Sequence, residues 1–206
     1  MNETQRPSVP QRILVADDEH LMATGLATSL NALGHTVIGP VSDGEAAIEC
    51  ARRESPDLAI LDIRMPGIGG LEAARTLWEE MKIPTIIISA FSDHSYIEQA
   101  QETGVFGYLL KPVSSENLRV TLSIAWARAT NERDKTARIS QLERSLASRR
   151  TVEQAKWKLI EKLDISEPDA HAMLQKAARN DRRPLADVAE EVLRGEGEML
   201  QPQADA

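Results

Sequence analysis

The stretch that decides the fold reads Leu58-Ala59-Ile60-Leu61-Asp62-Ile63-Arg64-Met65-Pro66-Gly67. Four apolar residues in succession, bounded by polar residues and a turn, are typical of a strand that is buried on both faces of a parallel sheet. Similar apolar runs recur on either side of it, at residues 13–16, 86–88 and 106–110. The stretch is therefore one repeat of an α/β pattern.

Helical segments alternate with these runs, and turn residues separate them. We expect helices near residues 20–33, 44–54, 70–81 and 94–103 and from 115 onward, between strands near 12–16, 36–41, 57–62, 84–89 and 106–110. Alternating strands and helices predict a doubly wound, five-stranded parallel sheet.

Five polar residues stand at the downstream ends of these runs: Asp17, Asp18, Asp62, Ser89 and Lys111. The carboxyl ends of parallel strands meet at one edge of an open sheet, where ligands bind. Three carboxylates held together repel one another, and Mg²⁺ is a suitable counter-ion for them. Asp62 is then placed to attack a phosphorus atom, with Lys111 neutralising the phosphoryl oxygens, so the pattern indicates an aspartyl phosphate.

Each of these residues has an ordinary structural interpretation when it is taken alone. An Asp-Asp pair before a helix is often a cap, and a single Asp62 or Ser89 is usually a turn residue. Lys111 before a proline is usually solvated, and Tyr108 would be a half-buried aromatic residue. Only the joint spacing of the set favours a site.

Residues 12–130 resemble the receiver domain of bacterial two-component response regulators, which has a flavodoxin-like fold. The resemblance rests on Asp17-Asp18-Glu19, the loop from Asp62 to Gly67, Ser89-Ala90-Phe91 and Lys111-Pro112. It implies a sensor histidine kinase as partner and a regulatory phosphoacceptor, not a turnover enzyme. The implied roles are Asp62 as phosphoacceptor, Asp17, Asp18, Asp62 and the Arg64 carbonyl as Mg²⁺ ligands, Ser89 and Tyr108 as the switch pair, and Lys111, before a cis peptide, as phosphoryl clamp.

Composition is that of ordinary globular material: 206 residues, 42% hydrophobic and 27% charged. No apolar run is long enough to span a bilayer, so we expect a cytoplasmic protein without a membrane segment. Cys50 is the only cysteine, which excludes an internal disulfide.

The last helix of this region continues beyond it, because residues 115–147 contain neither proline nor glycine. Ile139, Leu142 and Leu146 follow a 3-4 spacing, so we expect a helical or coiled-coil linker over residues 131–148. The pattern spans little more than one heptad, and a solvated single helix remains the alternative. If the helices pair, phosphorylation would favour a homodimer.

Charge is divided unevenly along the chain. Residues 1–132 have 10 basic and 18 acidic side chains, whereas residues 133–194 have 14 basic and 11 acidic ones. A basic module therefore follows an acidic domain, and the acidic segment 195–206 has the composition of a disordered tail.

The basic module, residues 149–194, is patterned as three amphipathic helices. The first spans about 149–163, the second begins with a capping box at Ser166, and the third follows Pro184. So small a bundle has a marginal core, which favours packing against a neighbouring helix or a second copy.

This module is similar to the ANTAR family, three-helix RNA-binding modules of transcription antiterminators. The similarity is carried by residues 150–156, by Ser166-Glu167-Pro168-Asp169-Ala170 and by residues 185–189. It implies recognition of RNA hairpins and a role in antitermination. Trp157 departs from the family pattern, which has glycine there, and would either stack on an unpaired base or pack against the linker. The candidate RNA contacts are Arg150, Gln154, Lys156, Trp157, Arg179, Arg182 and Arg183.

Other functions stay open. A DNA-binding response regulator is one alternative, although the third helix carries Asp187, Glu190 and Glu191, which phosphates would repel. A phosphatase would need a second aspartate two residues after Asp62, where the chain has Arg64. The remaining alternative is a protein-interaction adaptor that binds no nucleic acid.

Overall fold

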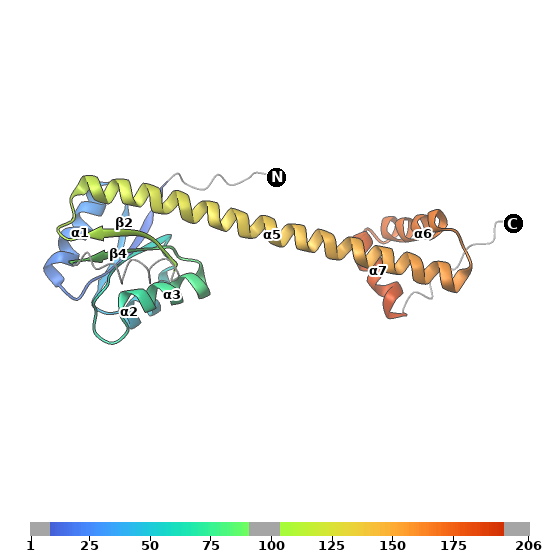
Figure 1. Ribbon diagram of the computed structural model, residues 1–206, viewed down its shortest axis with the longest axis horizontal. Coiled ribbons are helices and arrows are strands. Elements are labelled where there is room, and N and C mark those ends of the chain that lie inside the picture. The colour runs from blue at the N-terminus through green and yellow to red at the C-terminus, as the bar shows by residue number, and fades with distance from the viewer. Residues whose placement is uncertain (1–8, 91–103, 196–206) are drawn as a thin grey trace. The chain divides into compact units, whose positions relative to one another are not determined.

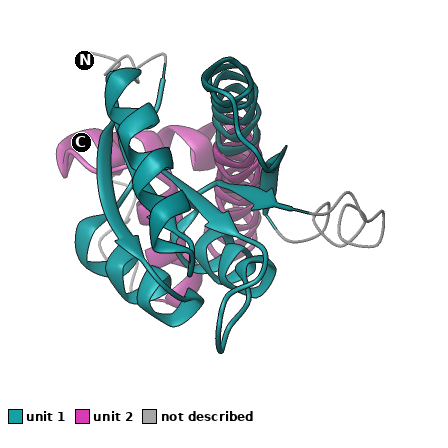
Figure 2. Ribbon diagram, turned by 90° about the vertical axis from the view of Figure 1, so that its left-hand side faces the viewer, with its two compact units in different colours: residues 1–133 teal, residues 134–206 magenta. Residues whose placement is uncertain are grey.

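A computed structural model describes residues 9–90 and 104–195 of the chain. Its contacts divide the protein into two compact units, residues 1–133 and 134–206 (Figure 2). The long helix α5, Ser115–Leu163, belongs to both (Figure 1). None of the described helices combines the length and apolar character that crossing a bilayer requires.

The first unit is a five-stranded sheet in the order β2-β1-β3-β4-β5, and every described pairing is parallel. This confirms the predicted fold class. The strands are β1 Arg12–Ala16, β2 Thr36–Val41, β3 Leu58–Asp62, β4 Thr85–Ser89 and β5 Val105–Leu110, and the helices between them are α1 His20–Ala32, α2 Gly44–Glu54 and α3 Gly70–Met81. The helix expected near 94–103 lies outside the described residues.

Both faces of the sheet are covered, which is why its central strands read as continuous apolar runs. One core joins alternate residues of the strands, such as Leu14 and Leu61, to α2 and α3. The other joins the residues between them, such as Val15 and Ile60, to α1 and α5. All five residues of β3 and of β4 are buried, so these two strands place their last residues, Asp62 and Ser89, at one edge.

The second unit is built around the end of α5, with α6 Glu167–Asn180 and α7 Leu185–Arg194. Its core consists of small and branched side chains from the three helices, with Ala155, Leu174 and Ala189 fully buried. Ser166 caps α6 as predicted, accepting a hydrogen bond from the backbone N–H of Asp169.

The segment 149–163 is helical as predicted, but it is not a separate helix. It is the last part of α5. Residues 115–163 contain neither proline nor glycine, so nothing in the sequence ends the helix between linker and bundle.

Candidate functional site

Asp62, the last residue of β3, has 6% of its surface exposed, and Asp17, directly after β1, has 5%. Asp18 beside it is exposed. One carboxylate oxygen from each of these three residues lies within 4.8 Å of the others. The structure thus brings together the acidic residues that the sequence predicted to meet.

Lys111 follows β5 and reaches the same place. Its Nζ lies 2.9 Å from Oδ2 of Asp17 and 3.1 Å from Oδ1 of Asp62. The backbone N–H of Lys111 donates to the carbonyl of Ser89 at 2.8 Å, which holds the lysine against the end of β4. The peptide between Lys111 and Pro112 is cis, as the resemblance implied.

Burial decides the electrostatics of this cluster. Burial raises the pKa of Asp62, and the charge of the neighbouring Asp17 raises it further. Hydrogen bonding to Lys111 acts in the opposite direction but does not outweigh burial. Burial also acts to lower the pKa of Lys111, but hydrogen bonds to Asp17 and Asp62 outweigh it and raise that pKa. Lys111 therefore stays protonated, and its ammonium pairs with Asp17 and Asp62, with a carboxylate oxygen of Glu19 3.8 Å away.

This donor set fits a hard divalent cation. Magnesium prefers oxygen ligands and commonly binds through a few carboxylates, water and phosphate oxygens. Asp17, Asp18 and Asp62 supply closely spaced oxygens, and a cation among them would reduce their mutual repulsion. Arg64 follows in the same loop, where its backbone N–H donates to Oδ2 of Asp62 at 3.3 Å. The role of its carbonyl as a ligand stays a prediction.

The expected switch pair lies on adjacent strands. Ser89 is fully buried at the end of β4, and Tyr108 lies on β5 opposite Ile87, half-buried against the core under α2 and α3. Their part in switching stays a prediction.

A close backbone approach holds the loop after Asp62 in place. The N–H of Gly70, the first residue of α3, donates to the carbonyl of Ile63 at 3.1 Å. A Cβ added at Gly70 would lie 2.0 Å from the carbonyl oxygen of Asp62. Only glycine therefore allows α3 to begin against the end of β3.

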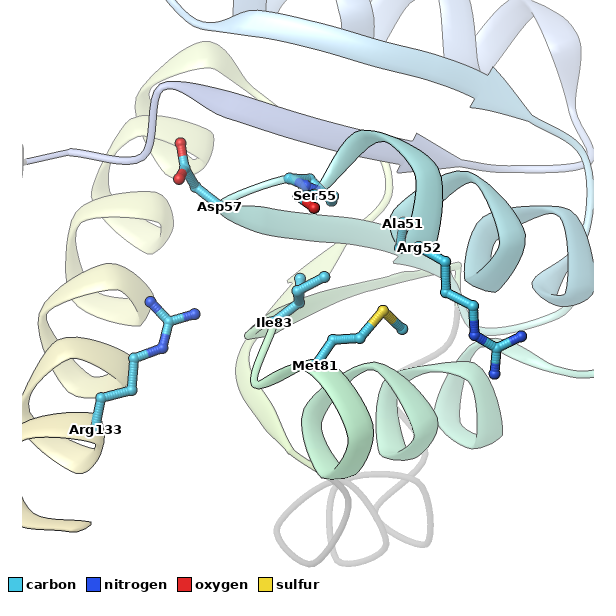
Figure 3. A pocket seen from close by; sticks show the side chains of 8 residues that line it. Ala51, Arg52, Ser55, Asp57, Met81, Ile83 and Arg133 are labelled. Carbon is cyan, nitrogen blue, oxygen red and sulfur yellow. The ribbon is translucent and has the colours of Figure 1, made fainter. Parts of the chain in front are cut away.

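Cavities border the described part of the first unit, and two of them bear on the site. One, of about 270 Å³, opens beside the acidic cluster between α1 and the start of α5, and its lining includes Asp17, Lys111, Leu21 and Met22. The other, of about 290 Å³, lies at the opposite edge of the sheet, among the ends of α2 and α3 and Arg133 of α5 (Figure 3). Arg133 donates there to the carbonyl of Lys82.

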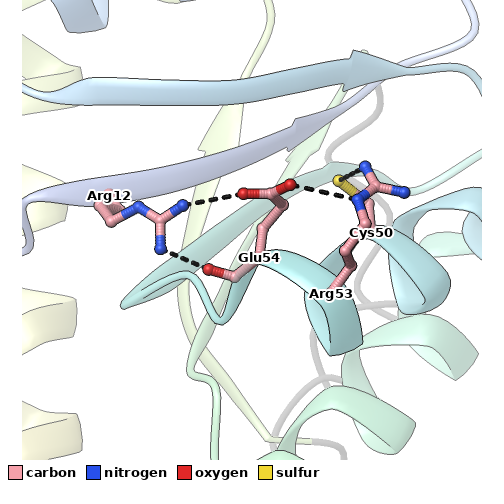
Figure 4. Close-up of polar contacts among 4 residues, drawn as sticks. All are labelled: Arg12, Cys50, Arg53 and Glu54. Carbon is pink, nitrogen blue, oxygen red and sulfur yellow. Dashed lines mark hydrogen bonds and ion pairs between the residues drawn. The ribbon is translucent and has the colours of Figure 1, made fainter.

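At the edge of the sheet opposite the acidic cluster, a network of ion pairs and hydrogen bonds connects the start of β1 to the end of α2 (Figure 4). Arg12 pairs with Glu54 at 3.0 Å, and Glu54 also pairs with Arg53 at 3.1 Å. Hydrogen bonding to Arg53 lowers the pKa of Glu54. The sequence did not indicate this network, which lies apart from the acidic cluster.

The candidate RNA contacts of the second unit do not share one environment. Arg150, Gln154 and Trp157 are exposed on α5, and Arg179, Arg182 and Arg183 are exposed from the end of α6 into the turn before α7. Arg183 pairs with Glu191 at 2.6 Å.

Lys156 differs from the other candidates because it is 7% exposed. Its Nζ lies 2.8 Å from Glu153 on the same helix and 2.7 Å from Glu167 at the start of α6. Lys158 joins α5 to α7 by donating to the carbonyl of Leu193 at 2.7 Å. Sequence reasoning missed both ties; the spacing from Glu153 to Lys156 was the one available signal.

We expect Lys156→Met to loosen the start of α6, because Glu153 and Glu167 would lose their shared cation. Amide hydrogen exchange over residues 167–174 should become several-fold faster. Hydrogen bonding to Lys156 lowers the pKa of Glu167. The difference from the unchanged protein should therefore be present above the ordinary Glu pKa and vanish as the pH falls through the lowered value. Unchanged exchange with weaker RNA binding would instead make Lys156 a direct contact.

Comparison with known proteins adds to this geometry. The response regulator receiver domain family matches residues 13–123, and the ANTAR domain family matches residues 140–193. The chain is 35% identical over 186 residues to the transcriptional regulatory protein PdtaR of Mycobacterium tuberculosis, covering 90% of this chain and 91% of that one.

Solved receiver domains are similar to the first unit. The receiver domain of a modulated diguanylate cyclase from Desulfovibrio desulfuricans is 33% identical with a TM-score of 0.56, covering 60% of this chain and 98% of that one. The receiver domain of NarL from Mycobacterium tuberculosis is 32% identical with a TM-score of 0.53, covering 56% of this chain and 95% of that one.

Proposed function

The chain belongs to the response regulators that combine a receiver domain with an ANTAR domain, and from this we propose that phosphorylation of Asp62 controls binding of RNA hairpins and thereby transcription antitermination. Within this proposal, residues 12–130 form the domain that receives the phosphoryl group, and residues 149–194 form the domain that binds RNA. Residues 131–148 are the helical linker between these two domains. A sensor histidine kinase is the proposed phosphodonor.

The observation that carries the first step is the position of Asp62 beside the acidic pair, with Nζ of Lys111 3.1 Å from its Oδ1. An oxygen of Asp62 forms the new bond to phosphorus as the bond from phosphorus to the donor's histidine nitrogen breaks, and the imidazole takes up a proton. The Lys111 ammonium neutralises charge on the phosphoryl oxygens. Bound Mg²⁺ would supply further positive charge there, held by Asp17, Asp18 and Asp62.

The phosphodonor has to reach the carboxylate of Asp62. The surface between α1 and the start of α5, beside that carboxylate, suits a protein partner. The cavity between α1 and α5 opens next to the cluster, and Leu21 on its rim is 86% exposed. Ser89 and Tyr108 are proposed to report the modified state to the rest of the chain. The protein then acts as a switch, not as a turnover enzyme.

RNA is favoured over duplex DNA as the ligand of the second unit by the charges of α7. Asp187, Glu190 and Glu191 lie on this short helix, and its one basic residue, Arg194, pairs with Glu190 at 3.6 Å. If α7 were a recognition helix in a major groove, these carboxylates would lie near the DNA phosphates and would be repelled by them. Exposed arginines lie instead on α5, at Arg150, and from the end of α6 into the following turn, at Arg179, Arg182 and Arg183.

Salt dependence tests this ligand directly. We expect the full chain with beryllium fluoride to bind an RNA hairpin with an affinity that falls with salt, and Arg182→Ala to reduce the log–log slope by about one. Arg144→Ala, a change at an exposed position of α5 outside the candidate RNA contacts, serves as the control. Binding that is no better than to duplex DNA or an unstructured strand, and indifferent to Arg182→Ala, would replace RNA binding with the adaptor function.

A further inference from the structure

A row of polar side chains runs along α6 and ends at one of the candidate RNA contacts. Its members are His171, Gln175 and Arg179, which are four residues apart and therefore neighbours on one side of the helix. Nε2 of Gln175 lies 2.9 Å from Nε2 of His171, and Nη2 of Arg179 lies 3.5 Å from Oε1 of Gln175. One turn before His171, Glu167 pairs with Lys156 at 2.7 Å, so the row begins where α6 is held to α5.

The two neighbours of Gln175 fix the orientation of its amide. A guanidinium only donates hydrogen bonds, so the amide oxygen, not the amide nitrogen, faces Arg179. The amide nitrogen then donates to Nε2 of His171, which places the proton of the neutral imidazole on Nδ1. An amide has two N–H groups and two lone pairs, and these contacts use one of each. One donor and one acceptor remain side by side, in a fixed order.

The imidazole that orients this amide is held at a cost. Nδ1 of His171 is buried and has no hydrogen-bond partner among the described residues. A buried polar atom that loses its bond to water and gains none in return destabilises the fold. A phenylalanine would fill similar space without that cost. The stability of the bundle therefore does not explain the imidazole, whereas the orientation of Gln175 does.

We propose that Gln175 determines specificity on the RNA surface: its amide forms a pair of hydrogen bonds with the edge of one unpaired base in the hairpin loop. His171 is the positioning residue that holds the amide for this contact. The inference rests on RNA binding by the second unit, as proposed above. Gln175 was not among the candidate contacts that the sequence indicated.

The surroundings of Gln175 suit this role. Arg179 is exposed one turn further along α6, and Arg182 is exposed in the turn that follows, whereas Gln175 itself is partly exposed. Contacts from arginines to phosphates position an RNA without reading its sequence. Unpaired loop bases present neighbouring donor and acceptor atoms on their edges, and an oriented amide matches such an edge in one arrangement only. Gln175 thus supplies the base recognition that the arginines beside it lack.

The test uses RNA hairpins with one stem and a randomised loop, selected by the full chain with beryllium fluoride. The selected hairpin is then compared with variants in which single loop bases are replaced. At one loop position the unchanged protein should prefer the selected base at least about tenfold, and Gln175→Ala should reduce that ratio to about one. Gln141→Ala, the same change at an exposed position of α5, should keep the full ratio. An unchanged ratio for Gln175→Ala, or an equal loss of affinity for every loop, would overturn the proposal.

His171→Phe separates orientation of the amide from stability of the fold. The loop-base ratio should fall as it does for Gln175→Ala, because nothing would hold the amide nitrogen. Amide hydrogen exchange in α6 should be unchanged or slower, because the unpaired nitrogen is gone. A retained ratio, or faster exchange, would overturn the assignment of His171 as a positioning residue.

Salt dependence shows which of the two proposals fails. Gln175 is neutral, so Gln175→Ala should leave the log–log salt slope of hairpin binding unchanged, whereas Arg182→Ala should lower it by about one. A slope that responds to Arg182→Ala, without any loop-base preference in the unchanged protein, would overturn base reading and leave RNA binding standing. Absence of hairpin binding would instead overturn the proposed function itself.

Discussion

Asp62→Asn is expected to abolish phosphorylation completely, because the amide has no anionic oxygen with which to attack phosphorus. The change is nearly isosteric, so the fold and the contact with Arg64 should survive. The measurement is the added phosphoryl mass after incubation with a small phosphodonor and Mg²⁺.

Two further variants make this result specific. Glu49→Gln, the same chemical change at an exposed position of α2, should be phosphorylated like the unchanged protein. Lys111→Ala should still be phosphorylated on Asp62, but phosphorylation should no longer cause the conformational change. Hairpin binding by this variant would therefore not respond to phosphorylation. Full modification of Asp62→Asn would assign the phosphoacceptor elsewhere.

Gly70→Ala is expected to have the second large effect. The new Cβ would lie 2.0 Å from the carbonyl oxygen of Asp62, a backbone atom that cannot move aside like a flexible side chain. The first turn of α3 or the end of β3 must shift, at a cost of about 3 kcal/mol or more. Phosphorylation of Asp62 should slow as well, since its position depends on that strand.

Urea denaturation and amide hydrogen exchange in β3 measure the loss. Gly25→Ala is the matched control, because a Cβ there meets nothing within 4 Å. It lies inside α1 and should stabilise the first unit by about 0.5–1 kcal/mol. Equal effects of the two changes would show that the close approach at Gly70 costs nothing.

Much of the first unit could be predicted from local pattern. Buried parallel strands have to be apolar on both faces. β3 is apolar up to its last residue, Asp62, and β4 has three isoleucines between Thr85 and Ser89. Once the strands are parallel, their carboxyl ends share an edge, so Asp17, Asp62 and Lys111 meet without further information.

The second unit was less predictable, because an amphipathic helix shows which side is apolar but not what covers it. Lys156 looked like a surface cation next to the core positions of α5. Its amine is instead enclosed by Glu153 and Glu167, and the second carboxylate arrives only when α6 folds back.

By itself the sequence determined the five parallel strands, the acidic cluster with its lysine and the helical character of most of the chain from Ser115 to Arg194. Periodicity and strand ends are local properties, and they carry this information. Only the tertiary structure decided that Lys156 is buried, that Trp157 is exposed and that Gly70 touches Asp62. Each of these depends on which element arrives from a distant part of the chain, and side-chain exposure and backbone contact exist only after that packing.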